Sequence, residues 1–144
     1  MTRALLFVAI AVLTAGCSNS SSDSSALAGL TAPSNATQIV DSFSGTVQVG
    51  ASDMHPFTVT TSSQPVLVTL TAAGPPSTIF MGVGVGAPTT DGLCSLLTNA
   101  AVVVQASSTA QLSGTISAGT YCVAVFDVGN QTGPVDYAVT VSHY

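Results

Sequence analysis

Charged side chains are almost missing from this chain of 144 residues. They account for 5 % of the sequence, Lys and Glu do not occur, and Arg3 is the single strong cation, whereas an average soluble protein has roughly 25 % charged residues. Proteins neutralise nucleic-acid phosphates with Lys and Arg, and bidentate clamps for phosphate or carboxylate need Arg. The composition therefore argues against nucleic-acid binding and against most phosphoryl-transfer chemistry.

A membrane-spanning run is also missing. The apolar run near the N-terminus covers residues 4–13, about half of the roughly 20 residues that a transmembrane helix needs. Arg3 precedes this run and small residues follow it, which is typical of a secretion signal over residues 1–16. The signal leads into Leu13-Thr-Ala-Gly-Cys17, which resembles the lipobox of bacterial lipoproteins, where cleavage leaves a lipid-modified cysteine as the first residue.

Cys17 is therefore the predicted lipid attachment site, carrying acyl chains such as palmitate. Each buried methylene contributes about 0.8 kcal/mol, so several acyl chains make an effectively permanent membrane anchor. Residues 17–39 are rich in Ser and have no hydrophobic period, which predicts a flexible tether. The expected location is the bacterial cell envelope, and Ser18 suits sorting to the outer membrane in a Gram-negative cell.

Residues 40–144 are predicted to form one all-β domain. Apolar residues alternate there with Ser, Thr and other polar residues, which is the period of half-buried strands. Pro56 and Pro65 stand at strand starts, where strands tolerate proline, and no amphipathic helix is expected. The pattern indicates an antiparallel β-sandwich of about eight strands. The expected strand segments are 43–49, 57–60, 66–71, 78–86, 93–97, 101–106, 112–116, 121–126 and 136–143.

The segment 78–86 has an unusual distribution of glycine. Alternation places Ile79, Met81, Val83 and Val85 on one face and Gly82, Gly84 and Gly86 on the other. Repeated glycine on one face of a strand predicts the close approach of another element or a sharp bend. The aromatic residues expected in the core are Phe57 and Phe126.

The remaining two cysteines, Cys94 and Cys122, are expected to form a disulfide, because export leads to an oxidising compartment. In the chain-entropy model such a bridge stabilises the fold by roughly 3 to 4 kcal/mol.

The sequence raises one enzyme hypothesis, a hydrolase with a Ser-His-Asp triad, since Asp53 and His55 are two residues apart and serines are abundant. The motif Gly-x-Ser-x-Gly is absent, and its nearest approach, residues 115–119, begins with Thr. His143 is expected on a fraying last strand. We therefore predict no enzymatic activity, with a hydrolase that uses His55 and Asp53 as the alternative.

No cofactor is expected. A structural calcium ion is the alternative, with Asp127 and Asn130 or Asp41 and Asp53 as candidate ligands in a calcium-stabilised adhesion module. The aspartates lack the regular spacing of a calcium loop, and turn capping is the simpler explanation for them.

A resemblance to a known family lies in the C-terminal part of the chain. It is carried by Leu112-Ser-Gly-Thr-Ile-Ser-Ala-Gly-Thr-Tyr-Cys-Val-Ala-Val125, by Phe126-Asp127 and by Tyr137-Ala-Val-Thr-Val141. The similarity extends upstream to Phe43–Val47 and Phe57–Thr60 and so covers most of residues 40–144. These segments resemble the bacterial pre-peptidase C-terminal domain. The resemblance implies a secreted β-sandwich of jelly-roll type, usually appended to peptidases and implicated in secretion or in binding of substrate or matrix.

Together these observations predict an envelope-anchored lipoprotein with a non-catalytic binding or structural module. The expected partners are the membrane, through the lipid, and an envelope glycan or protein.

Overall fold

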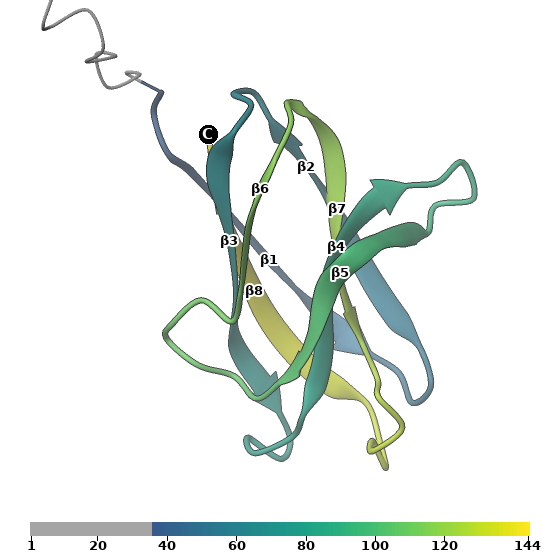
Figure 1. Ribbon diagram of the computed structural model, residues 1–144. Coiled ribbons are helices and arrows are strands. Elements are labelled where there is room, and N and C mark those ends of the chain that lie inside the picture. The colour runs from purple at the N-terminus through teal and green to yellow at the C-terminus, as the bar shows by residue number, and fades with distance from the viewer. Residues whose placement is uncertain (1–35) are drawn as a thin grey trace, which may run out of the picture. The chain divides into compact units, whose positions relative to one another are not determined.

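The computed structural model describes residues 36–144. The predicted signal segment, Cys17 and nearly all of the tether lie outside the described residues. All regular structure within residues 36–144 is β, in two four-stranded antiparallel sheets (Figure 1). The strands are β1 (Ile39–Val47), β2 (Ser52–Val59), β3 (Gln64–Gly74), β4 (Met81–Pro88), β5 (Cys94–Val104), β6 (Leu112–Ile116), β7 (Gly119–Phe126) and β8 (Val135–His143).

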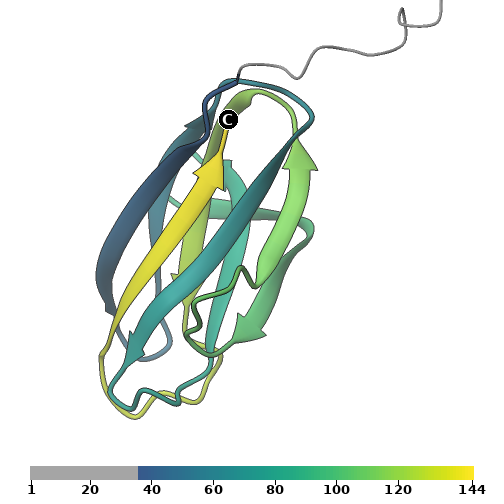
Figure 2. The same cartoon turned by 90° about the vertical axis from the view of Figure 1, so that its left-hand side faces the viewer.

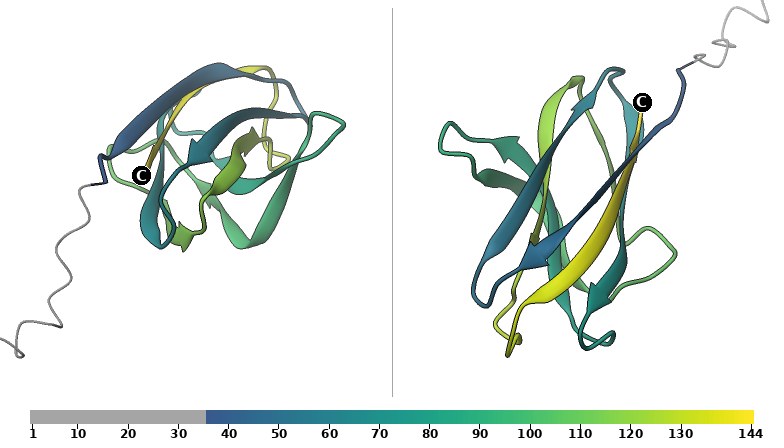
Figure 3. Two further views of the ribbon diagram at one scale, coloured as in Figure 1. Left: turned by 90° about the horizontal axis from the view of Figure 1, so that it is seen from above. Right: turned by 180° about the vertical axis from the view of Figure 1, so that it is seen from behind.

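Sheet A has the order β1-β8-β3-β6 and sheet B the order β2-β7-β4-β5. Figure 2 shows sheet A from outside, with the yellow β8 between β1 and β3, and Figure 3 shows the two layers from above and from behind. The first strand pairs with the last, the second with the seventh, the third with the sixth and the fourth with the fifth. This is the pairing of a long hairpin folded over itself. The predicted jelly-roll-like sandwich is therefore confirmed.

The core lies between the sheets and follows the predicted alternation. On β8, Tyr137, Val139 and Val141 are buried, whereas their neighbours are exposed or half-buried. Phe57 is 4 % exposed and belongs to the core as expected. The other buried side chains in the middle of the core include Val47, Val59, Val68, Leu70, Met81, Val83, Val123, Val125 and Val135.

The glycine face of β4 is covered by neighbouring elements, which confirms the predicted close approach. A Cβ at Gly82 would collide with the ring of Phe126, and one at Gly84 would lie 2.8 Å from the side chain of Leu96. Phe126 was expected in the core, but it is half-buried and packs over Gly82 on the outer face of sheet B. The reason is the register: Val125 already fills the inward position of β7 at this point.

The expected strands 93–97 and 101–106 are in fact one strand, β5. Its pairing with β4 shifts register opposite Gly84 and Gly86, and Asn99 has a positive φ of 59° there. The polar residues at this bulge interrupt the alternation without ending the strand, because the pairing with β4 resumes on both sides. In the part of the chain that the structure describes, no helix is long and apolar enough to cross a membrane.

Candidate functional site

The edge formed by β1 and β2 carries the first cluster of titratable side chains. Tyr137 on β8 donates a hydrogen bond to Asp53 Oδ2 at 2.9 Å, and its hydroxyl lies 2.8 Å from His55 Nε2. The ring of Phe43 stacks on His55 with a centroid distance of 4.8 Å. Gly45 allows the close approach, since a Cβ there would lie 2.9 Å from the Tyr137 hydroxyl.

The two hydrogen bonds of the Tyr137 hydroxyl use it once as a donor and once as an acceptor. A phenol has one proton, and Tyr137 donates it in the hydrogen bond to Asp53, so the Tyr137 oxygen is left as the acceptor toward His55 Nε2. Burial and the hydrogen bond to Asp53 raise the pKa of Tyr137 above its ordinary value of 10. The phenol therefore stays protonated. His55 Nε2 and Asp53 Oδ2 are 3.9 Å apart, and both contact the Tyr137 hydroxyl. Tyr137 thereby connects β8 of sheet A with β2 of sheet B.

A second pair lies further along the same edge. His143 Nε2 is 2.9 Å from Asp41 Oδ2, and the ring of Phe57 lies 5.5 Å from the imidazole. His143 is 1 % exposed, so the expectation of a fraying last strand was wrong. His143 is the partner of Ile39 in the pairing of β8 with β1. This long-range pairing holds the end of β8 in place.

The hydrolase alternative needs a nucleophilic side chain beside His55 or His143. Among the hydrogen bonds of residues 36–144, none joins His55 or His143 to a Ser, Thr or Cys side chain. Both imidazoles instead pair with Asp or Tyr between the sheets, which favours a structural role for both clusters.

The two candidate calcium pairs differ in geometry. Asp41 and Asp53 are not brought together, because Asp41 pairs with His143 whereas the carboxylate of Asp53 lies against Gly45, four residues further along β1. Asp127 and Asn130 do belong to one loop, but the Asn130 side chain donates to Phe80 O at 3.1 Å. Within residues 36–144, no group of three His, Cys, Asp or Glu side chains could hold a metal ion.

Asp127 acts as a cap for the loop between β7 and β8. Its Oδ2 accepts the N–H of Gly50 at 2.8 Å, and its Oδ1 accepts main-chain N–H groups of residues 129–131, at 2.8 Å from Gly129. These hydrogen bonds, the one from Gly50 first, lower the pKa of the Asp127 carboxyl below its usual value of 3.8. The carboxylate thereby links the two turns at one end of the sandwich.

Asp127→Asn is expected to make stability less dependent on pH in acid. A carboxyl group with a depressed folded-state pKa stabilises the fold above its unfolded pKa, and this stabilisation is lost as the pH falls through the folded pKa. Urea unfolding of both proteins from about pH 7 to about pH 2 tests this. The wild type should be the more stable at neutral pH and the two should converge in acid. Parallel curves would contradict the capping role.

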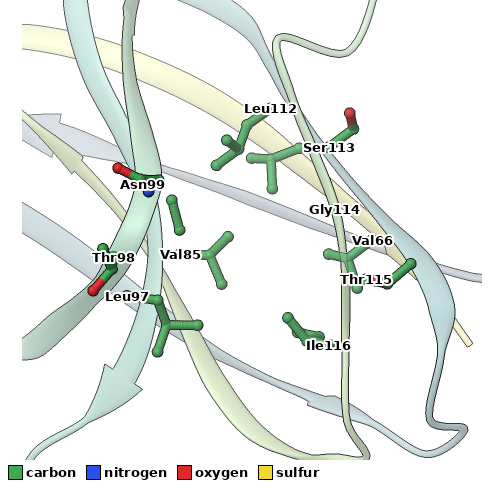
Figure 4. Close-up of a pocket in the computed structure, with 12 residues that line it drawn as sticks. Val66, Val85, Leu97, Thr98, Asn99, Leu112, Ser113, Gly114, Thr115 and Ile116 are labelled. Atoms are coloured by element: carbon green, nitrogen blue, oxygen red, sulfur yellow. The ribbon is translucent and has the colours of Figure 1, made fainter.

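The opposite edge of the sandwich is open. A cleft of about 320 Å³ lies between β5 and β6 and reaches the interior (Figure 4). Leu97 and Val85 approach it from sheet B, and Leu112 and Ile116 from sheet A, whereas Ser113 and Thr115 project from the other side of β6. The apolar side chains that line it are Val66, Val68, Val85, Leu97, Ala100, Leu112 and Ile116.

The cleft depends on Gly114. Side chains alternate along a strand, so Gly114 occupies the inward position between Leu112 and Ile116, which both pack against the core. A Cβ at Gly114 would meet no atom within 4 Å. An ordinary apolar residue at this position would fill the space.

Sequence reasoning missed this site. The signal was present, because a glycine stands between two apolar residues at inward positions of a strand expected at 112–116. The sequence does not show that β5 lies opposite β6 and leaves the space beside Gly114 empty. This arrangement depends on the pairing of strands that are far apart in the sequence.

A second, wider hollow of about 680 Å³ lies on the outer face of sheet B, with Met54, Leu96 and Phe126 among its lining side chains. The Cys94–Cys122 disulfide, which confirms the predicted pair, contributes Cys94 to its wall.

Comparison with solved structures finds structural similarity, whereas the sequence comparisons find none. No family model matches the chain, and no curated protein matches it in sequence. The crystal structure of Aeromonas hydrophila PliG, a periplasmic lysozyme inhibitor of g-type lysozyme, is similar at a TM-score of 0.48 and 16 % sequence identity. The match covers 72 % of this chain and 84 % of that chain.

Proposed function

We propose that the protein is a cell-envelope lipoprotein, anchored through Cys17, whose β-sandwich is a non-catalytic module that binds a protein ligand in the β5–β6 cleft. The relationship to the pre-peptidase C-terminal domain is part of this proposal and rests on the sequence motifs alone. The observation that carries the binding function is the apolar cleft at one edge, while the histidines and their aspartates serve to close the other edge.

A protein ligand suits the cleft better than a glycan. The side chains that point into it are aliphatic, and the polar groups at its rim, such as Thr98 and Asn99, are uncharged. Apolar side chains gain about 25 cal/mol per Å² of surface removed from water, whereas sugar hydroxyl groups would need hydrogen-bond partners that these aliphatic walls do not provide.

Two-dimensional NMR with isotope-labelled protein tests the binding site. Short apolar peptides should shift the amide signals of β5 and β6, and Gly114→Val, which fills the cleft, should abolish these shifts while leaving the fold as stable or more stable. Gly133→Val is the matched control, because a Cβ at Gly133 also meets open space but lies in the β7–β8 loop. Shifts confined to the outer face of sheet B, or oligosaccharide binding there, would overturn the proposal.

The anchor is tested separately by the intact mass of the protein extracted from membranes. The expected mass begins at Cys17 and includes acyl chains. An unacylated soluble species would contradict the anchor without affecting the cleft.

A further inference from the structure

Within residues 36–144, the main-chain groups at the outer edge of β6, next to the cleft, have no hydrogen-bond partners. β6 is the last strand of sheet A, and Pro65 of β3 pairs with Thr115. Proline has no N–H, so Thr115 is not one of the residues that exchange two hydrogen bonds with β3. Such residues alternate along an antiparallel pair. The N–H and C=O groups of Ser113 and Thr115 therefore point to the free edge.

Hydrogen bonds around this edge agree with that assignment. The carbonyl of Ile116 faces β3, where it accepts the N–H of Ser63 at 3.2 Å. Just beyond β6, the side-chain amide of Gln111 pairs with both main-chain groups of Leu70, at 2.8 and 3.3 Å. Within residues 36–144, no side chain covers the main-chain groups of Ser113 and Thr115 in this way.

β6 also differs from the other three edge strands, because it has no inward charge, no proline and no bulge. Inward-pointing charges, proline and bulges are the usual devices that protect a sheet edge. β1 has the inward Asp41, β2 has Asp53 and Pro56, and β5 has the bulge at Asn99. β6 reads Leu-Ser-Gly-Thr-Ile, which contains no charge and no proline.

We infer that the ligand is an extended strand of another, basic protein, which pairs with the free edge of β6 and places an apolar side chain beside Gly114. This inference rests on the proposed function, since it describes how the cleft is filled. A strand added to sheet A directs alternate side chains toward the interior. At this edge the interior is the cleft, and Gly114 leaves room for one side chain between Leu112 and Ile116.

Charge selects the kind of partner. Residues 36–144 contain five aspartates and neither Lys nor Arg. A segment with Lys or Arg next to its apolar residues is attracted by this field, which also accelerates association. A second copy of the same domain carries the same negative charge and is repelled.

The test uses the peptide acetyl-Lys-Thr-Val-Thr-Val-Thr-Lys-amide and the isotope-labelled protein. Strand pairing predicts that the peptide slows hydrogen exchange at the amides of Ser113 and Thr115, whereas those of Leu112, Gly114 and Ile116, already bonded to β3, change little. Two versions methylated on alternate amide nitrogens complete the design. Only one set of amides faces β6, so one version should bind at least about tenfold more weakly and the other should not.

The outcomes separate this inference from the proposed function. If both methylated peptides bind like the parent while the shifts still map to β5 and β6, the cleft binds ligand but strand pairing is wrong. If no peptide shifts these signals, the proposed function fails as well. A peptide with Glu in place of the two Lys should bind more weakly, and the difference should shrink with added salt. Equal affinity of the Lys and Glu peptides would contradict the basic partner.

Discussion

Phe57→Ala is expected to lower the free energy of unfolding by about 3 to 5 kcal/mol, the usual cost of truncating a buried Phe. Phe57 is 4 % exposed, and its ring lies 6.0 Å from the ring of Tyr121 and 5.5 Å from that of His143. These neighbours belong to β7 and β8, one in each sheet, and both strands are central. Because neither strand has room to move inward, most of the vacated volume remains as a cavity. Urea unfolding followed by circular dichroism measures the loss.

Phe57→Leu is the control for this effect. It keeps most of the apolar volume and should cost less than about 1.5 kcal/mol. Phe57→Ala, in contrast, removes a ring that packs near His143, so it should also expose the Asp41–His143 pair to water. A loss below about 1 kcal/mol for the Ala variant, or equal losses for both variants, would contradict a central role of this ring.

The alternation of apolar and polar residues was enough to predict which side chains face the core on several strands. On β8, Tyr137, Val139 and Val141 are buried as expected, and the apolar face of the segment around β4 is buried as well. The period of two is a local property of the backbone and can be read along one strand. It does not say which sheet a strand joins or how deep a position lies.

Three errors share one physical origin. Thr98 and Asn99 at the β5 bulge have the local character of a turn, Phe126 has the hydrophobicity of a core residue, and His143 stands at a chain end. In each case a contact with a residue far away in the sequence determines the structure. Pairing with β4 keeps β5 continuous, Phe126 packs over Gly82, which has no side chain, and His143 pairs with the carboxylate of Asp41. Local propensity cannot report such contacts.

The candidate site was out of reach for the same reason. Gly114 is visible in the sequence, and its inward orientation follows from Leu112 and Ile116. The empty space beside it depends on how far β5 stands from β6 across the edge of the sandwich, and this distance is set by the packing of the whole core.

Removing the disulfide by Cys94→Ala together with Cys122→Ala is expected to cost about 3 to 4 kcal/mol. The bridge joins residues 28 apart in sequence, and loss of the crosslink gives the unfolded chain more freedom. In the folded state the bridge links the start of the edge strand β5 to the central strand β7 across β4. It passes over Gly86, where a Cβ would lie 2.8 Å from Cys94 Sγ. The absence of a side chain at Gly86 thus makes room for the bridge.

The consequence for function follows from the place of β5 in the cleft. Leu97 stands three residues after Cys94 and forms part of the wall opposite β6. Without the bridge, the start of β5 keeps only its pairing with β4, so the peptide affinity of the cleft should fall together with stability. Reduction of the wild-type protein should reproduce both effects, which separates the crosslink from the two substitutions. If reduction lowers stability by less than about 1 kcal/mol and leaves binding unchanged, pairing with β4 alone is sufficient to hold the wall.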